Sequence, residues 1–215
     1  MTPELAARFR EVEEAERAAY GKYRNDFLSM CQTGKADRLG DCLEGLRFHH
    51  SALSEAFAAA SRLPKVSPTF KRALRDFWIA NGNSLRGDFP GGDLELMTAF
   101  RRLMPTYIGP GVRLYRGDSF INRKRRTYGL AWSASRRVAE AFATGTWQAH
   151  EGGSVLLETD APPEAIICKF NSSEREYLID RRKLGPVLVV KRFEQKKLLC
   201  SPRSPDPLAG DKLEH

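Results

Sequence analysis

The first half of the chain has the apolar spacing of α-helices. Large hydrophobic residues recur there every three or four positions, which places them on one face of a helix. Chain breaks are predicted at Gly34, at residues 63–68 and at residues 81–92, where Gly, Pro, Asn and Asp supply turn chemistry. We expect each helix to bury its apolar stripe. The stripes are formed by Leu5, Phe9 and Val12, by Leu39, Leu43, Leu46, Leu53 and Phe57, by Phe70, Leu74 and Phe77, and by Leu96, Phe100 and Leu103.

The second half has the pattern of short β-strands separated by turns. From about Pro105, runs rich in β-branched and aromatic residues alternate with turn residues. A single helix is predicted over residues 136–143, with Ser135 as its N-cap. Helices first and strands afterwards favour an α+β fold over a parallel sheet with alternating crossovers. The predicted strands cover residues 112–115, 154–159, 165–169, 176–179 and 187–193.

Composition narrows the class of protein. With 215 residues, 41% of them hydrophobic, the chain can form one domain, or a small catalytic domain with a helical extension. No run reaches the roughly 18 apolar residues of a membrane-spanning helix, and residues 1–10 lack the apolar core of a signal peptide. We therefore expect a soluble, cytoplasmic protein with no membrane partner, and delivery into another cell by a route without such a peptide stays open.

Charge, cysteines and histidines add further limits. A formal net charge of +8 predicts a surface that attracts anions, including nucleic acid, nucleotides and acidic protein faces. Cys31, Cys42, Cys168 and Cys200 lie far apart with no Cys-x-x-Cys pair, so we expect free thiols and no metal site. His50 continues an apolar stripe, which favours a hydrogen-bonded core or interface histidine over a catalytic one.

Three short motifs in the second half carry candidate chemistry. Taken singly, each has an ordinary explanation, as an edge-strand arginine, as helix-capping serines and as the wet face of a strand. Their order along the chain, an arginine, then serines, then paired glutamates, gives them a joint meaning. The motifs are Leu114-Tyr115-Arg116-Gly117, Leu130-Ala131-Trp132-Ser133-Ala134-Ser135 and Glu174-Arg175-Glu176-Tyr177.

Together these motifs resemble the Arg, Ser-Thr-Ser, Glu-x-Glu pattern of the cholera-toxin-like branch of the ADP-ribosyltransferases. The flanking residues 105–110 and 138–143 are similar to a group of bacterial and phage ADP-ribosyltransferase-like proteins. The resemblance covers about residues 95–195. It implies a mixed, mainly antiparallel β-sandwich of the ADP-ribosyltransferase fold as the catalytic core. In this division, residues 1–104 form a helical region, 105–200 the core and 201–215 a loose tail ending in a tag remnant.

The resemblance also implies a reaction. Members of the family cleave the nicotinamide–ribose bond of NAD and transfer ADP-ribose to an acceptor. An arginine offers a planar fork of donors that suits a pyrophosphate, so Arg116 is the expected NAD-binding group. Bond breaking builds positive charge on the ribose, which a fixed carboxylate stabilises. The second acid of Glu-x-Glu has this role in the family, and here it is Glu176.

The other motif residues have supporting roles in the resemblance. Glu174 takes the position that faces the acceptor, where a carboxylate is associated with arginine acceptors, and it shares a face with Glu176 if the segment is extended. Ser133 matches the serine whose hydroxyl orients the catalytic carboxylate. Ala134 replaces the middle threonine, and Ser135 is expected to cap the next helix. The expected NAD-binding residues are Arg116, Gly117, Trp132, Ser133, Phe142 and Glu176.

Two aromatic residues and two basic segments have alternative interpretations. Trp132 and Phe142 could stack on nicotinamide or pack in the core. The basic run at residues 123–126 is expected near the NAD cleft, either as a solvated loop or as a loop facing a nucleic-acid acceptor. The same interpretation applies to residues 181–183. Lys191, Arg192, Lys196 and Lys197 belong to this second cluster.

The sequence leaves several functions open. The first is a mono-ADP-ribosyltransferase acting on protein arginine, and a second uses the same chemistry on RNA or DNA. An NAD glycohydrolase, with water as acceptor, and a catalytically inert nucleic-acid-binding module are the alternatives. The presence of Glu174, Glu176 and Arg116 at the motif positions argues against a catalytically inert module. The expected partners are NAD, a macromolecular acceptor and, for a toxin-like role, an immunity or antitoxin protein.

Overall fold

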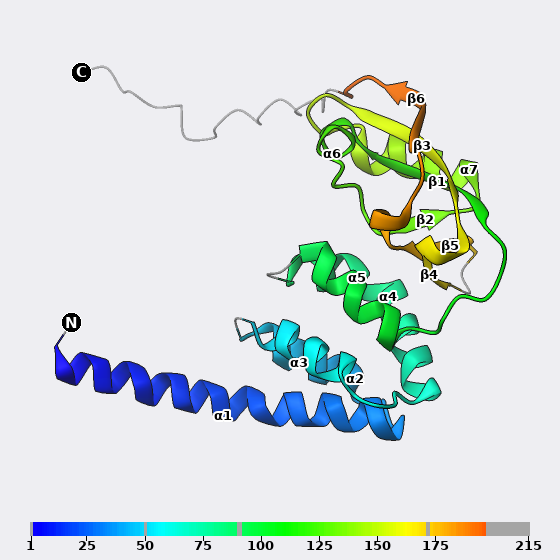
Figure 1. Cartoon of the computed structure of the whole chain (residues 1–215). Helices are drawn as coiled ribbons and strands as arrows, with labels where there is room; N and C mark the ends of the chain where they lie inside the picture. The colour runs from blue at the N-terminus through cyan, green and yellow to red at the C-terminus, as the bar shows by residue number, and fades with distance from the viewer. Residues whose placement is uncertain (1, 50, 90–91, 171–172, 197–215) are drawn as a thin grey trace, which may run out of the picture.

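The computed structural model describes residues 2–49, 51–89, 92–170 and 173–196. The interpretations of His50 and Cys200 and of the tail from residue 201 fall outside these ranges. The fold is α+β. Helices α1 to α5 gather in one part of the molecule, and the strands form the other part (Figure 1). No helix within the described ranges combines the length and apolarity needed to cross a membrane.

Helices of the helical part begin and end at residues that are favoured as helix caps. Gly34 ends α1 in the left-handed conformation at φ 80°, and its N–H bonds the Met30 carbonyl at 2.9 Å. Ser67 accepts from the Thr69 amide at the start of α4, which confirms the break predicted over 63–68. The helices are α1 (Pro3–Thr33), α2 (Leu39–Arg47), α3 (Ala52–Ser61), α4 (Pro68–Gly87) and α5 (Gly92–Leu103).

Two helix predictions are corrected by the structure. The stripe from Leu39 to Phe57 belongs to two helices, because the chain turns before α3 at Ser51, which has φ 67°. The break predicted over residues 81–92 starts too early, since α4 continues to Gly87. Asn81 is accommodated inside the helix because its side-chain amide bonds the Phe77 carbonyl one turn back at 3.1 Å.

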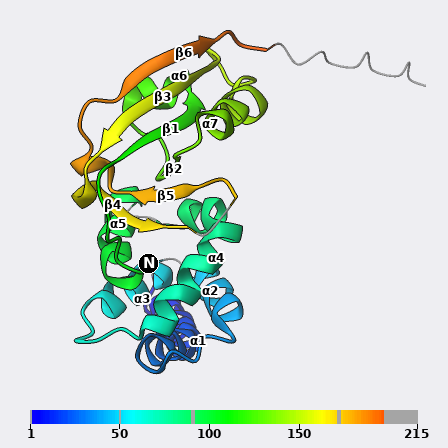
Figure 2. The same cartoon turned by 90° about the vertical axis from the view of Figure 1, so that its right-hand side faces the viewer.

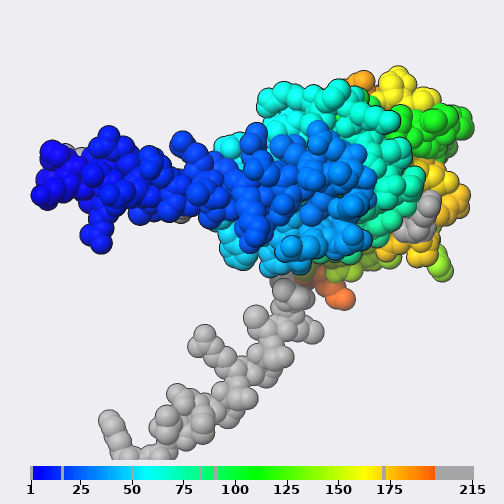
Figure 3. All heavy atoms as spheres, turned by 90° about the horizontal axis from the view of Figure 1, so that it is seen from below, coloured from blue at the N-terminus to red at the C-terminus, as the bar shows by residue number. Residues whose placement is uncertain are grey.

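The first apolar stripe of α1 is exposed, contrary to the prediction. Leu5, Phe9 and Val12 keep 47%, 56% and 53% of their surface accessible. The N-terminal part of α1 extends beyond the rest of the helical layer and meets no neighbouring element (Figures 1 and 3). Burial in α1 starts only further along, where Phe27 and Cys31 enter the core.

The described strands belong to one antiparallel sheet, with the order β4-β5-β2-β1-β3-β6. Its two three-stranded halves, β4-β5-β2 and β1-β3-β6, meet at one residue pair, Tyr115 with Ser133 (Figure 2). The antiparallel pairing agrees with the mainly antiparallel arrangement that was expected, and the short β2 joins both halves by hydrogen bonds. The strands are β1 (Val112–Ser119), β2 (Ala131–Ser133), β3 (Ser154–Ala161), β4 (Ile166–Lys169), β5 (Glu176–Ile179) and β6 (Leu188–Phe193).

Two further helices lie among the strands. The predicted helix over 136–143 is α7 (Arg136–Phe142), and the Ser135 hydroxyl caps it by accepting from the Val138 amide. A π-helical turn, η1 (Ala143–Trp147), continues it. Helix α6 (Phe120–Arg125) was not predicted, and it contains most of the basic run expected as a loop. Its short length and lack of buried residues leave no periodic apolar signal.

The helical layer and half of the sheet share one hydrophobic core. Ile167 and Phe170 near β4, together with Leu178 of β5, pack in the same buried cluster as the residues of α1 to α5. A second cluster, which includes Leu114 and Trp132, fills another face of the sheet. The helical region is thus packed directly against the strands, and the pocket described below opens where they meet.

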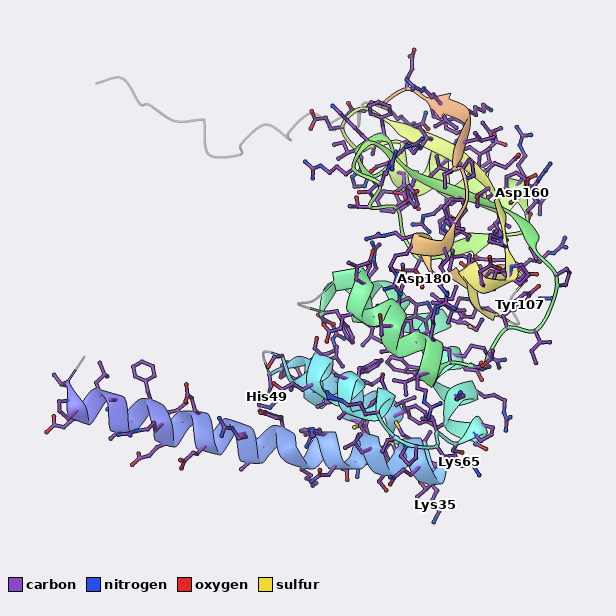
Figure 4. All side chains as sticks on the ribbon, viewed as in Figure 1. Lys35, His49, Lys65, Tyr107, Asp160 and Asp180 are labelled. Atoms are coloured by element: carbon purple, nitrogen blue, oxygen red, sulfur yellow. The ribbon has the colours of Figure 1, made fainter. Side chains whose placement is uncertain are left out.

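A buried carboxylate also joins the two parts. Asp180 has no accessible surface and accepts from Arg101 of α5 at 3.0 Å and from Arg182 at 2.8 Å (Figure 4). Burial alone would raise the pKa of Asp180, but the hydrogen bonds from the two arginines outweigh it and lower the pKa to about 2. This contribution to stability is therefore present at neutral pH and is lost as pH falls below the ordinary value of 3.8.

Replacing Phe27 by alanine should lower the free energy of unfolding by about 3–5 kcal/mol, because a fully buried ring leaves a cavity. Phe9→Ala on the same helix is the matched control and should change it by less than about 0.5 kcal/mol, since that ring is exposed. Urea unfolding followed by circular dichroism measures both. Equal losses for the two variants would show that the N-terminal part of α1 is packed in solution.

Candidate functional site

A pocket of about 560 Å³ opens between α4 and the sheet. Its walls come from α4, β1, β2, α7, the turn η1 and the segment that leads into β5. This volume falls within the range of about 300–1,000 Å³ that is typical of small-molecule sites. Six of the seven predicted site residues line it, although they come from distant parts of the sequence. They are Arg116, Gly117, Ser133, Phe142, Glu174 and Glu176.

Arg116 of β1 is held in one orientation. Its Nε donates to Asp118 at 2.7 Å, and one terminal nitrogen donates to the Ala131 carbonyl. Gly129 leaves room for the guanidinium, since a Cβ atom at that position would lie 2.3 Å from an Arg116 nitrogen. The guanidinium is therefore a preorganised cation at the pocket wall rather than a mobile surface group.

Asp118 is the centre of this arrangement, and no sequence motif indicated its role. Its carboxylate has no accessible surface and accepts from the Ser119 amide at 2.8 Å, from the Asn122 side chain at 2.7 Å and from the Gly129 amide at 3.2 Å, besides Arg116. A buried carboxylate with this many donors is fully satisfied. The Asp118 carboxylate thus connects β1, the start of α6 and the turn before β2 through hydrogen bonds.

Gly117 forms part of the pocket wall for a packing reason. A Cβ atom at this position would lie 2.3 Å from the Ala139 carbonyl oxygen and 2.3 Å from the Ala143 amide nitrogen. Helix α7 can therefore approach β1 only because residue 117 is glycine. The approach brings Phe142 and the π-helical turn to the pocket, where Thr146 and Trp147 also line it.

Ser133 fixes the main chain that carries the two acids. It lies opposite Glu176 in the β2–β5 register, and its hydroxyl donates to the Glu174 carbonyl oxygen while accepting from the Ser135 amide at 2.9 Å. The resemblance implied that this hydroxyl orients the catalytic carboxylate directly. In the structure the hydroxyl orients the backbone between β2 and β5, and so holds the segment from which the carboxylates project.

Glu174 and Glu176 line the same pocket, but not through an extended segment. Arg175, between them, is in the left-handed region at φ 52°, and β5 starts only at Glu176. The Ala134 amide donates to the Arg175 carbonyl at 3.0 Å, which holds this turn against the chain beyond β2. The two acids therefore converge through a fixed turn, where alternation along a strand was expected.

The electrostatics of the pocket centre on Glu176. Burial raises the pKa of this half-buried carboxyl above its ordinary value of 4.5, the neighbouring Glu174 raises it further, and Arg116 lowers it. A perturbed carboxyl facing a fixed guanidinium inside a pocket is typical of a functional site. Among the motif residues, Glu176 thus has the surroundings expected of a group that stabilises positive charge on a ligand.

Trp132 does not line the pocket and belongs to the core, which corrects its expected contact with NAD. Its ring is 1% exposed and packs edge-on against Tyr128 at a centroid distance of 5.8 Å. The indole N–H donates to the Gly129 carbonyl at 3.2 Å. The cause is strand alternation, because Ala131 and Ser133 face the pocket and the residue between them faces the other side.

The helical half contributes pocket residues that the motifs did not indicate. Trp78, Gly82 and Arg86 of α4 line the pocket opposite the strands. Their spacing of four residues places them on one helix face, and that periodicity is the signal that could have identified them. Arg86 is held by two hydrogen bonds to Asp93, at 2.6 and 2.8 Å.

The basic run at residues 123–126, which the sequence predicted near the NAD cleft, does not itself line this pocket. Arg123 and Arg126 instead line a separate cleft. Among the described residues, no group of three or more histidine, cysteine, aspartate or glutamate side chains is placed to hold a metal ion. Cys168 near the site is buried, and burial raises the pKa of its thiol to about 12.

Asp118→Asn should lower the free energy of unfolding by roughly 3 kcal/mol, because it leaves the Arg116 charge without its buried partner. Asp160→Asn removes the exposed partner of Arg113 at the far end of β1 and should leave the unfolding midpoint unchanged. Thermal unfolding of both variants tests whether the buried pair of Asp118 and Arg116 stabilises the fold. A loss for Asp118→Asn no larger than that for Asp160→Asn would show that the buried pair does not organise the pocket.

Comparisons with known proteins found no similar protein. No protein-family model, no curated protein and no solved structure matches it. The side chains of the pocket and their geometry are therefore the basis for proposing a function.

Proposed function

We propose that the chain is an NAD-dependent mono-ADP-ribosyltransferase with an ADP-ribosyltransferase fold, which cleaves the nicotinamide–ribose bond and transfers ADP-ribose to a macromolecular acceptor. The observation that carries the proposal is convergence. Arg116, Ser133 and the pair Glu174 and Glu176 lie far apart in sequence, yet the fold brings them to one pocket. Isolated surface residues have no reason to meet in this way.

Arg116 suits the pyrophosphate of NAD. Two of the five guanidinium donors bond Asp118 and Ala131, which fixes the plane and leaves other N–H groups for a ligand. Arginine forks match phosphate oxygens in pairs, and a preorganised fork loses little conformational entropy when it binds. The pocket volume of about 560 Å³ is of the size of sites that bind small molecules and cofactors.

Glu176 suits the reacting end of NAD. Loss of nicotinamide builds positive charge on the ribose, and a carboxylate held by the β2–β5 pairing stabilises that charge without having to reorganise. Partial burial strengthens the effect, since the interaction takes place away from bulk water. Ser133 maintains this geometry through its bond to the Glu174 carbonyl.

Glu174 suits the acceptor side. It lines the main pocket and also a shallower depression formed with Arg137 and Phe142 at the outer surface, so it connects the NAD pocket with the region from which an acceptor approaches. A carboxylate there can pair with a guanidinium or help remove a proton from an incoming nucleophile. Protein arginine is accordingly one acceptor class, and water is the acceptor in a glycohydrolase.

Glu176→Gln should lower the rate of nicotinamide release from NAD by roughly 10²–10³-fold, the cost of removing one preorganised electrostatic group. Glu164→Gln is the matched control, because this glutamate is exposed in the turn η2 (Pro163–Ala165), outside the pocket. Chromatographic detection of nicotinamide, with labelled NAD and cell protein, RNA or DNA as acceptors, measures cleavage and transfer together.

Three outcomes of this assay separate the alternatives. Label on one acceptor class that disappears in Glu176→Gln supports the transferase. Nicotinamide release with no labelled acceptor replaces it with a glycohydrolase. Intact wild-type protein that neither releases nicotinamide nor transfers label leaves a binding module without NAD chemistry and overturns the proposal.

The pH dependence of nicotinamide release should carry the signature of Glu176. Its carboxylate is the active form and its pKa is raised, so activity should be lost on acidification at a midpoint above 4.5. Glu174→Gln removes a neighbouring negative charge and should move that midpoint to lower pH. Initial rates from pH 4 to 8, measured with water as acceptor, test this. A midpoint that does not move would mean that the two carboxyls are not coupled.

A further inference from the structure

Two basic segments that are far apart in sequence meet in a second cleft. Arg123 and Arg126, at the end of α6, and Arg181 and Arg182, in the turn η3 (Arg181–Lys183), line a space of about 570 Å³. Tyr128 and the loop from residue 184 to 187 form the remaining walls. The four guanidinium groups concentrate positive charge in a concave surface, where the low-dielectric walls strengthen the field.

The acids near the cleft neutralise only part of this charge. Asp93 accepts from Arg181 and also from Arg86, while Asp180 accepts from Arg182 and Arg101. Each of these carboxylates therefore serves two arginines. Within the described ranges, Arg123 and Arg126 take part in no ion pair.

The guanidinium of Arg123 has few hydrogen-bond partners within the protein. Its Nε is buried and has no hydrogen-bond partner, and one terminal nitrogen donates to the Val187 carbonyl at 3.3 Å. Leaving a buried charged donor without a partner is costly, so Arg123 is an incompletely satisfied cation in the wall of the cleft. Arg126 is exposed beside it, at the left-handed C-cap of α6 with φ 55°.

The cleft lies next to the main pocket. Tyr128 lines the cleft and Gly129, the next residue, lines the pocket. Arg86 of the pocket and Arg181 of the cleft share the Asp93 carboxylate, and Arg86 also reaches the Thr127 carbonyl at 3.5 Å. Arg86 of the pocket and Arg181 of the cleft are thus joined through one shared carboxylate.

We propose that this cleft binds the sugar-phosphate backbone of a nucleic acid and does not read its bases. Guanidinium forks bind phosphate oxygens in pairs, and arginines from two segments suit successive phosphates. Exposed Lys124, Arg125 and Lys183 extend the positive surface beyond the cleft. The aromatic residue in the wall, Tyr128, is 7% exposed and is not available for base stacking.

The test is binding of fluorescently labelled 20-base-pair RNA and DNA duplexes, measured by anisotropy from 50 to 300 mM salt with no NAD present. The double variant Arg123→Gln, Arg126→Asn removes the two arginines without acid partners, and asparagine tolerates the left-handed backbone at position 126. Lys35→Gln, Lys65→Gln is the control, because it removes the same charge from exposed positions in the helical layer, far from the sheet (Figure 4).

The cleft variant should bind duplex about tenfold or more weakly at 50 mM salt, and its slope of log affinity against log salt should fall by about two, one for each lost phosphate contact. The control should keep the wild-type slope. Arg126→Asn alone should lower the slope by about one. Because Arg126 is exposed, this single variant tests the proposal even if the double variant fails to fold.

Equal losses in the cleft and control variants would reduce the binding to net charge and overturn the proposal. Competition by a polyglutamate peptide as effective as unlabelled duplex would also overturn it, because the cleft would then recognise acidic protein segments. No NAD is present in this assay, so its result is independent of the transferase proposal, and either proposal can fail without the other.

Discussion

The fold depends on the need to pair carboxylates that are taken out of water. Asp118 and Asp180 have no accessible surface, and the Asp93 side chain is 8% exposed, yet each is bonded to at least one arginine. Burying an unpaired carboxylate would cost several kcal/mol, so these pairs require both partners to be in place. Asp93 and Asp180 connect α5 to the strands, and Asp118 connects β1 with the turn before β2.

The pocket follows from this pairing. Asp118 fixes Arg116, Gly129 leaves space for the guanidinium, and Gly117 lets α7 approach closely enough to close one wall. Ser133 then holds the turn that presents Glu174 and Glu176 opposite the arginine. The result is a cation and two anions at fixed positions in a partly buried pocket. Such an arrangement suits a ligand with an anionic centre and a sugar that becomes positively charged.

The sequence predicted the pieces of the site better than their arrangement. The run 176–179 matches β5, and the motif residues meet in the pocket, because β-propensity and residue chemistry are local signals. The exposed stripe of α1 and the single sheet were not predictable, since both depend on which elements become neighbours. Trp132 shows the same limit, because one residue of alternation separates a core ring from a ligand-stacking ring. The part played by Asp118 could not be read locally either, as its partners include Gly129, eleven residues away.

The most direct measurement is a crystal structure of the Glu176→Gln variant grown with NAD, since this variant should bind NAD but cleave it slowly. We predict that the pyrophosphate lies on the Arg116 guanidinium and the nicotinamide ribose within hydrogen-bond distance of residue 176. NAD bound away from the pocket, or a pocket that stays empty at millimolar NAD while the fold is intact, would contradict the assignment of this site.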